Sequence, residues 1–138
     1  MDKVDWKRYE EWLEVLPNCI KEDPLWRLEA YRKSLFLSDL AWLDCEKLQG
    51  NRLGQARLSQ LLRSSGSISA NVEEGYGRGF GKDYARFLRI AIGSARETRG
   101  WYWRSRQALE AEVVNHRMNL ATEIIRMLTI IAEQQRKR

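Results

Sequence analysis

The stretch from Ser64 to Arg106 reads SSGSISANVEEGYGRGFGKDYARFLRIAIGSARETRGWYWRSR and predicts two helices joined by a glycine turn. After the turn, apolar residues recur every three or four positions, which is typical of one buried face of an α-helix. The residues of this face are Tyr84, Phe87, Leu88, Ala91, Ala95, Thr98, Tyr102 and Leu109. The opposite face of this arginine-rich helix carries Lys82, Arg86, Arg89, Gly93, Arg96, Gly100 and Arg104.

The residues before the turn predict a helix with two packing faces. Its apolar face consists of Leu58, Leu61, Ser65, Ile68, Val72 and Tyr76. Its opposite face consists of Arg63, Ser67, Ala70, Asn71 and Glu74. Serine and glycine are poor helix formers, so a helix rich in them is expected to serve close packing. We therefore predict that this opposite face, together with Gly93 and Gly100, contacts another subunit.

The arginine-rich face leaves two interpretations open. Gly93 and Gly100 each lower helix propensity by about 1 kcal/mol relative to alanine, and a missing Cβ lets another backbone or a phosphate approach closely. One interpretation is a subunit contact, by analogy with small-residue helix contacts. The other is a nucleic-acid groove, because arginine pairs well with phosphate. In that case the nucleic-acid-binding residues are Lys82, Arg86, Arg89, Arg96 and Arg104, with Arg63 and Arg99 as outliers.

The composition is that of a globular protein. The chain has 138 residues, of which 43% are hydrophobic and 31% charged, and we expect one domain over residues 1–138. The sequence contains no run of eighteen apolar residues, so it predicts no membrane span. The two cysteines, Cys19 and Cys45, have no metal-site spacing and no secretory context. They indicate free thiols in a reducing compartment, and we expect a cytoplasmic protein.

The net charge of +5 is unevenly distributed. Residues 1–24 contain seven acidic and four basic residues, whereas residues 52–106 contain eleven basic and four acidic residues. Such a basic region is typical of a polyanion-binding surface. It is equally typical of an interface that pairs arginine with carboxylates, so charge alone does not choose between them.

Helical periodicity recurs along the chain, and no segment alternates with the period of a strand. The expected helices are Asp5–Leu16, Leu25–Leu48, Gln55–Tyr76, the arginine-rich helix ending near Leu109, and Val113–Gln135. Asp23 is the expected N-cap of the second helix, and Trp42 is expected on its buried face. Residues 1–24 are then a short helix and a connector. The predicted fold is all-α, an antiparallel up-down four-helix bundle with a short extra N-terminal helix.

The residue patterns of common active sites are missing from the sequence. Glycines alternate from Gly75 to Gly81, but no strand precedes them, and phosphate-binding loops need a strand before the helix. His116 is the only histidine and is expected at the solvated surface. The neighbouring carboxylates Glu73 and Glu74 point in different directions on a helix and cannot form a dyad. We expect no catalysis, no metal site and no cofactor.

Several segments are shared with a known family. The longest are SSGSISANVEEGY at residues 64–76, GKD at residues 81–83 and RFLRIAIGSARE at residues 86–97. Shorter ones are DPLW at 23–26, EAY at 29–31, Val114, HR at 116–117 and IIR at 124–126. On these residues the chain resembles the bacterial four-helix-bundle family named for proteins encoded in 23S rRNA intervening sequences. It departs from that family at Glu73, where alanine is more common, and at Gly100, where a continuous helix is expected.

The resemblance implies an antiparallel four-helix bundle without enzymatic activity, which forms a homopentameric barrel in several relatives. A related branch comprises the accessory proteins of diversity-generating retroelements. In that branch a basic pentameric barrel binds nucleic acid and the reverse transcriptase. The resemblance therefore implies the fold more directly than the function.

Two hypotheses follow. In the first, the chain is a non-catalytic homo-oligomer, expected to be pentameric, that binds structured RNA or DNA through the arginine-rich face. Trp101 and Trp103 would then offer stacking surfaces for bases, or lie at an interface, whereas Tyr102 is expected in the core. In the second, the chain is a scaffold or adaptor, for example accessory to a reverse transcriptase, and the arginines make subunit contacts with Glu74, Asp83 and Glu97.

Overall fold

The computed structural model describes residues 8–138 and contains only helices within them. The elements are α1 (Tyr9–Val15), α2 (Asn18–Lys21), the 3₁₀ helix η2 (Pro24–Arg27), α3 (Glu29–Leu48), α4 (Gln55–Gly77), α5 (Lys82–Arg104) and α6 (Ala111–Arg136). The all-α prediction is thereby confirmed for this part of the chain. Residues 5–7 of the predicted first helix lie outside the described residues. None of the helices in residues 8–138 is long and apolar enough to cross a membrane.

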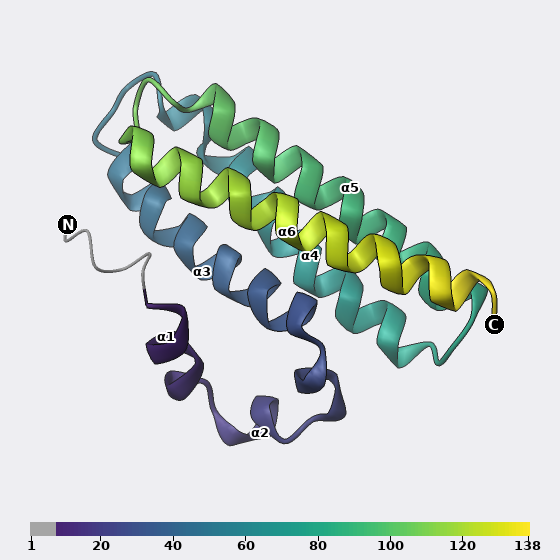
Figure 1. The fold of residues 1–138 in the computed structure, drawn as a ribbon. Coiled ribbons are helices and arrows are strands. Elements are labelled where there is room, and N and C mark those ends of the chain that lie inside the picture. Colours follow the sequence, from purple (N-terminus) through teal and green to yellow (C-terminus); the bar gives the residue numbers. More distant parts are fainter. Residues whose placement is uncertain (1–7) are drawn as a thin grey trace.

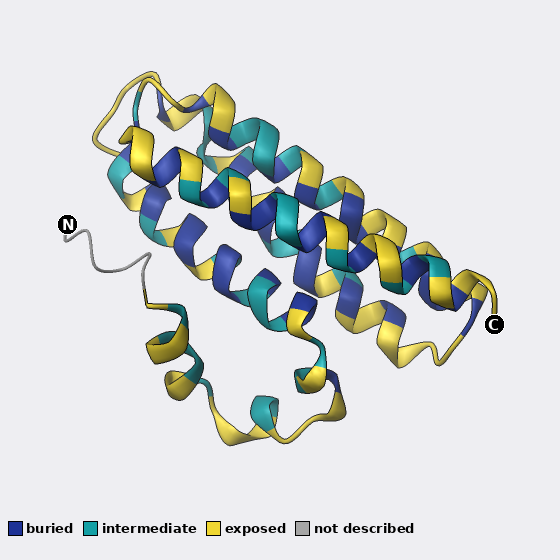
Figure 2. Ribbon diagram, in the orientation of Figure 1, coloured by how far each residue is buried: buried dark blue, intermediate teal, exposed yellow. Residues whose placement is uncertain are grey.

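The four long helices pack around a shared core. α4 contacts α3 and α5, and α6 contacts α5 and α3. Figure 1 shows the four long helices side by side, with α1, α2 and η2 along one side of α3. Each long helix contributes a fully buried leucine; these are Leu37, Leu61, Leu88 and Leu128. Burying one such side chain contributes roughly 1.5–3 kcal/mol, and Figure 2 shows that the buried residues face the neighbouring helices.

The turn between α4 and α5 depends on two glycines. Gly79 and Gly81 have φ angles of 93° and 96°, a region that side chains other than glycine rarely adopt. This confirms the predicted glycine turn. The backbone N–H of Gly81 also donates a 2.9 Å hydrogen bond to Oε1 of Gln135 on α6, which ties the turn to the last helix.

The first long helix is shorter than predicted. Leu25–Leu48 is not one helix, because Leu28 has an extended backbone (ψ 108°) that separates η2 from α3. Asp23 caps η2 as expected, since its Oδ1 accepts a 2.8 Å hydrogen bond from the N–H of Leu25. Trp42, which was expected in the core, is 62% exposed.

Two further helix bounds differ from the predictions. The expected connector before Asp23 contains the single-turn helix α2, Asn18–Lys21. The arginine-rich helix ends at Arg104 rather than near Leu109, and Leu109 is buried beyond its end. A 3₁₀-like turn, in which the N–H of Ala108 donates to the carbonyl of Ser105 at 2.9 Å, replaces the expected last helical turn.

A buried ionic network joins three of the long helices. Arg117 on α6 donates to Asp44 on α3 through Nε (2.8 Å to Oδ2) and Nη2 (3.1 Å to Oδ1). The hydroxyl of Tyr102 on α5 donates to the same Asp44 Oδ2 at 2.6 Å. His116, which was expected to be solvated, is half-buried, and its Nδ1 lies 2.9 Å from Arg117 Nη1. Burial and the Arg117 charge lower the pKa of His116 to about 4.

Candidate nucleic-acid and subunit interface

The basic surface lies on the outer side of α5. All five predicted nucleic-acid-binding residues are exposed there; they are Lys82, Arg86, Arg89, Arg96 and Arg104. Along its length α5 carries six basic residues and only two acidic ones, Asp83 and Glu97. The helix spans about 33 Å at a rise of about 1.5 Å per residue. The basic face thus forms a continuous line of positive charge rather than a single cluster.

Two of these cations form ion pairs at the surface. Arg86 Nη2 lies 3.1 Å from Oδ1 of Asp83, one turn earlier on α5. Arg89 Nη2 lies 3.4 Å from Oε2 of Glu133 on α6. All four side chains are substantially exposed, and exposed pairs contribute only about 0–1 kcal/mol to stability. These arginines can therefore exchange their carboxylate for a phosphate at little cost.

Two of the other three cations on the basic face have no such partner among the described residues. Within residues 8–138, Arg96 and Lys82 have no ion pair and no side-chain hydrogen bond, and both are exposed. Their charges face solvent in the single chain. Arg96, near the middle of α5, is the cation most available to an external anion.

Several arginines of this region cover aromatic rings. The Arg86 guanidinium carbon lies 4.4 Å from the centroid of Phe87, and that of Arg78 lies 5.2 Å from the same ring. Arg104 covers Trp101 at 4.7 Å, and Arg106 covers Trp103 at 4.1 Å. The two tryptophans are thus already occupied by guanidinium groups on the ring face. Tyr102 is fully buried, as expected, and is unavailable to a base.

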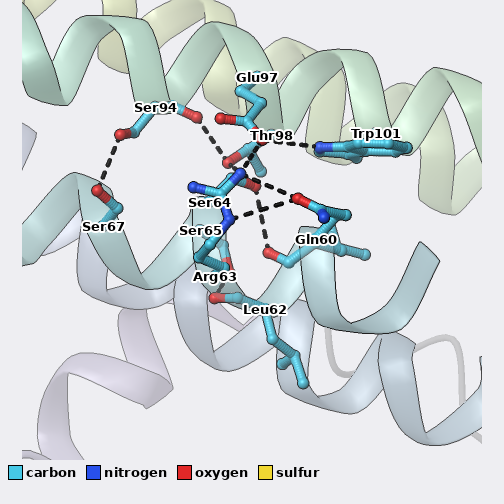
Figure 3. Close-up of polar contacts among 11 residues, drawn as sticks. Gln60, Leu62, Arg63, Ser64, Ser65, Ser67, Ser94, Glu97, Thr98 and Trp101 are labelled. Atoms are coloured by element: carbon cyan, nitrogen blue, oxygen red, sulfur yellow. Dashed lines mark hydrogen bonds and ion pairs between the residues drawn. The ribbon is translucent and has the colours of Figure 1, made fainter.

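A polar seam lies between α4 and α5 (Figure 3). Ser94 Oγ donates to Ser67 Oγ at 2.9 Å. One turn further, Thr98 Oγ1 lies 2.9 Å from Ser64 Oγ and donates to the carbonyl of Ser94 at 2.8 Å. Such short side chains bring the two helices close together, which explains why α4 tolerates a run of weak helix formers.

The solvent edge of the seam carries an ionic cluster. Arg63 of α4 pairs with Glu97 of α5 and also donates from Nη2 to Oε1 of Gln60 at 3.0 Å. Nε1 of Trp101 donates to Glu97 Oε2 at 3.0 Å (Figure 3). Arg63 is therefore committed to its own chain in the structure. Glu97 holds both an arginine and a tryptophan in place at the border of the basic face.

The remaining predicted interface residues occupy the same side of the molecule. Ala70 is exposed, and Asn71 donates from Nδ2 to the carbonyl and Oγ of Ser67 at 2.8 and 2.9 Å. Glu74 pairs with Arg78 of its own helix at 3.0 Å, not with another helix. The space beside Gly93 is open, since a Cβ built there would meet no atom within 4 Å.

Gly100 differs from Gly93 in its surroundings. A Cβ at Gly100 would lie 2.7 Å from Nη1 of Arg104, so the missing side chain accommodates the folded-back guanidinium. Of the two glycines, only Gly93 leaves room for an external partner. Nearby Ile90 is 43% exposed, and together Ala70, Ile90 and Gly93 give the α4–α5 side a small apolar strip beside the charges.

Gly75 has a packing role that sequence analysis did not assign to it. It lies within α4 and is buried, and a Cβ there would lie 2.7 Å from Cβ of Phe87 and 3.0 Å from Cδ1 of Tyr84. The glycine lets α4 approach α5 just before the turn. Its position three residues after Val72, on the buried face, was the signal that could have revealed it.

The sequence profile of the 23S rRNA-intervening sequence protein family matches residues 27–130. The chain belongs to this family. The match begins at the end of η2 and covers α3, α4 and α5 and most of α6. It therefore includes the whole basic face of α5, the polar seam and the buried network around Asp44.

Among solved structures, the chain is similar to another protein of this kind. It is a crystal structure of a protein with unknown function from the S23 ribosomal protein family from Bacteroides thetaiotaomicron VPI-5482. The two share 26% sequence identity with a TM-score of 0.70, over 75% of this chain and 98% of the other. No curated protein matches the chain significantly. The comparisons thus support the fold of a 23S rRNA-intervening sequence protein and leave its activity to be argued from the site.

Proposed function

We propose that this 23S rRNA-intervening sequence protein is a non-catalytic, cytoplasmic homo-oligomer that binds structured RNA or DNA through the outer face of α5. Its unit is an antiparallel up-down four-helix bundle, and the family resemblance implies a homopentamer. The observation that carries the proposal is the exposed line of cations on α5, in which Lys82 and Arg96 have no partner within residues 8–138. Such cations bind phosphate without losing an existing ion pair.

The dimensions of α5 support a duplex ligand. Its basic face extends about 33 Å, close to the roughly 34 Å of one helical turn of duplex DNA. Arginine and lysine contacts to phosphate position a protein on a nucleic acid but carry no sequence information. We therefore expect weak sequence preference. For about five phosphate contacts, affinity should fall roughly 500-fold between about 50 and 200 mM salt.

A scaffold function is the second candidate, and the open strip beside the charges favours it. Ala70, Ile90 and Gly93 lie uncovered on the α4–α5 side, and no atom approaches the position of a Gly93 Cβ. Small exposed residues beside arginines suit a helix of a second subunit or of a protein partner such as a reverse transcriptase. In this case the α5 cations would pair with carboxylates across the subunit contact.

One experiment separates the two functions. Purified protein, freed of co-purifying nucleic acid, is titrated with a labelled structured RNA at several salt concentrations, alongside the variant Lys82→Glu/Arg96→Glu. Nucleic-acid binding predicts a steep salt dependence and loss of RNA affinity in the variant, with an unchanged oligomer mass by light scattering. A scaffold predicts that the same charge reversals dissociate the oligomer.

The matched control is Arg27→Glu/Lys21→Glu, which makes the same charge change on η2 and α2. η2 packs against α3 and α2 packs against η2, whereas α5 packs mainly against α4 and α6. The control should retain RNA affinity and oligomer mass. Equal loss of RNA binding in both double variants would mean that only net charge matters, and no RNA binding at low salt would contradict the nucleic-acid function.

A further inference from the structure

A hollow at one end of the bundle is lined by two residues that each have a buried polar atom without a partner in the described part of the chain. The loop between α3 and α4 and the turn after α5 meet at this end (Figure 1). The hollow between them has a volume of about 480 Å³, within the range of about 300–1,000 Å³ typical of small-molecule sites. Arg57, Arg104 and Ser105 are among the residues that line it.

Two atoms of this lining lack hydrogen bonds. Only three buried side-chain N or O atoms in residues 8–138 have no partner; they are Tyr9 Oη, Arg57 Nε and Ser105 Oγ. Two of the three therefore belong to residues that line the same hollow. Ser105 is only 2% exposed, so its hydroxyl reaches no bulk solvent. A buried polar atom without a partner costs about 1–3 kcal/mol, and a bound group that accepts hydrogen bonds would remove that cost.

The chemistry of the lining favours an anion. It contains the two arginines, Ser105, and the amide side chains of Asn51 and Gln107, but no aspartate or glutamate. The Asn51 Oδ1 accepts a 2.9 Å hydrogen bond from the N–H of Gly54, which leaves its Nδ2 as a donor. Guanidinium groups bind phosphate through paired hydrogen bonds. The lining thus offers donors and positive charge without a competing carboxylate.

The backbone N–H groups at the two helix ends beside the hollow are already bonded. The N–H groups that begin α4 are bonded, as Gln55 donates to Asn51 O at 3.0 Å and Arg57 to Gly54 O at 3.0 Å. At the end of α5, the N–H of Ser105 donates to Trp101 O and Tyr102 O at 3.0 and 3.1 Å. The recognition therefore rests on side chains, with Arg57 and Ser105 at its centre.

We propose that this hollow binds a phosphate group, held by Arg57 and the Ser105 hydroxyl, with Arg104 as a second guanidinium at its rim. Arg104 now lies over Trp101, 4.7 Å from the ring centroid, and swings toward the ligand. The site goes beyond the binding of nucleic acid along α5, with which it shares only Arg104. The phosphate can belong to a nucleic-acid strand or to a small phosphate compound.

Inorganic phosphate is the probe for the first test. Its addition at constant ionic strength, with chloride as the control anion, should give saturable NMR shifts of the Arg57 Nε–H and the Ser105 N–H. Arg57→Gln should weaken phosphate binding about tenfold, the size expected when a charge-assisted hydrogen bond is lost. Ser105→Ala should weaken it severalfold without lowering the melting temperature, because it removes an unpartnered buried hydroxyl.

The matched control is Arg52→Gln, which removes the same charge from the loop just before α4 but lies outside the hollow's lining. It should retain the affinity of the wild-type protein for phosphate. Three results would each contradict the proposed site. The first is equal weakening of phosphate binding in Arg52→Gln and Arg57→Gln, and the second is the same NMR shifts with chloride. The third is full phosphate affinity in Arg57→Gln and Ser105→Ala.

A second arm identifies the source of the phosphate. RNAs of one sequence with a 5′-phosphate or a 5′-hydroxyl are compared. If the wild type binds the phosphorylated RNA more tightly and Arg57→Gln abolishes this difference, the site holds a terminal phosphate. Equal binding of both RNAs, weakened by Arg57→Gln, assigns a backbone phosphate. If Arg57→Gln leaves RNA binding unchanged while the wild type still binds phosphate, the ligand of the hollow is a small phosphate compound. The Lys82→Glu/Arg96→Glu variant should keep its phosphate affinity, so the two proposals fail independently.

Discussion

Arg117 of α6 and Asp44 of α3 form a two-point ion pair in which the side chains are 2% and 0% exposed, respectively. The pair is closed off by Tyr102 of α5, whose hydroxyl donates to Asp44 at 2.6 Å. Burial and the Asp44 charge raise the pKa of Tyr102 well above its ordinary value, so this hydroxyl stays a donor. One carboxylate thereby fixes the relative positions of three helices.

Removing one partner of this pair should destabilise the fold strongly. Asp44→Ala leaves the Arg117 charge buried without a counterion, which costs about 3–5 kcal/mol. Urea unfolding followed by circular dichroism measures the loss. The double variant Asp44→Leu/Arg117→Met is the control and should recover most of the stability, because apolar replacements of buried ion pairs are often neutral. A small effect of Asp44→Ala would show that water reaches the pair.

The protonation of His116 should make stability depend on pH. Its pKa is lowered from 6.5 to about 4 in the folded state, so the unfolded chain binds a proton in this window and the folded chain does not. Stability therefore rises with pH across the window, and the stabilisation is fully present above pH 6.5 and is lost toward pH 4.

Thermal unfolding of the wild type and of His116→Asn across this pH window checks that dependence. The asparagine oxygen can still accept a hydrogen bond from Arg117, but it does not titrate. The melting temperature of the wild type should fall more steeply with acidification than that of the variant. Parallel curves for the two proteins would assign the acid sensitivity to other groups.

Gly75 should resist substitution by the smallest side chain. Gly75→Ala places a Cβ 2.7 Å from the Phe87 Cβ, which is fixed to the α5 backbone, so the two helices must separate. Overpacking of this kind costs about 1–3 kcal/mol. The control is Gly66→Ala in the same helix, where a Cβ meets nothing within 4 Å and stability should rise by about 1 kcal/mol. Denaturant unfolding of both variants gives the comparison.

Gly93 tests whether the basic face meets another subunit. Gly93→Leu enters open space in the single chain and improves helix propensity, so it should not destabilise a monomer. If a second subunit packs there, the oligomer mass measured by light scattering should fall. Thr129→Leu, at an exposed position of α6, serves as control. An intact oligomer would mean that the subunits contact each other elsewhere and that the basic face of α5 is free to bind nucleic acid.

The two cysteines should react very differently. Burial, with a smaller contribution from the Asp44 charge, raises the pKa of Cys45 to about 12, whereas Cys19 is exposed. Thiolates, not thiols, are the reactive form. Iodoacetamide should therefore label Cys19 in the native protein and both cysteines only after denaturation, as read by mass spectrometry. Labelling of Cys45 in the native state would mean that α3 and α4 separate readily.

The long helices were predictable because their apolar residues recur with helical spacing, and α4 begins at Gln55, close to where it was predicted. The single turn of α2 is too short to show a period. η2 was merged with α3 because Pro24 suits the first turn of either helix type. Trp42 was misplaced because its position in the pattern matches the core, whereas its side chain is 62% exposed.

The candidate site was only partly predictable from the sequence. The exposure of the α5 cations followed from the amphipathic pattern. The ion pairs of Arg63 and Arg89 did not, because they depend on which helices become neighbours. The burial of Arg117 was not predicted either. The one signal for it was Asp44, which has the same helical spacing as Leu37, Ala41 and Leu48 on the buried face of α3.

The guanidinium groups that lie on Phe87, Trp101 and Trp103 give arginine a covering role that lysine fills less well. A planar guanidinium stacks flat on a ring, whereas a compact ammonium is more strongly hydrated and covers less of it. Replacing these arginines by lysine would preserve the net charge of +5 and yet uncover three aromatic rings. The chain would keep its attraction for polyanions but expose aromatic surface that favours aggregation. Its solubility would therefore depend on guanidinium groups that cover the rings, and not only on the number of positive charges.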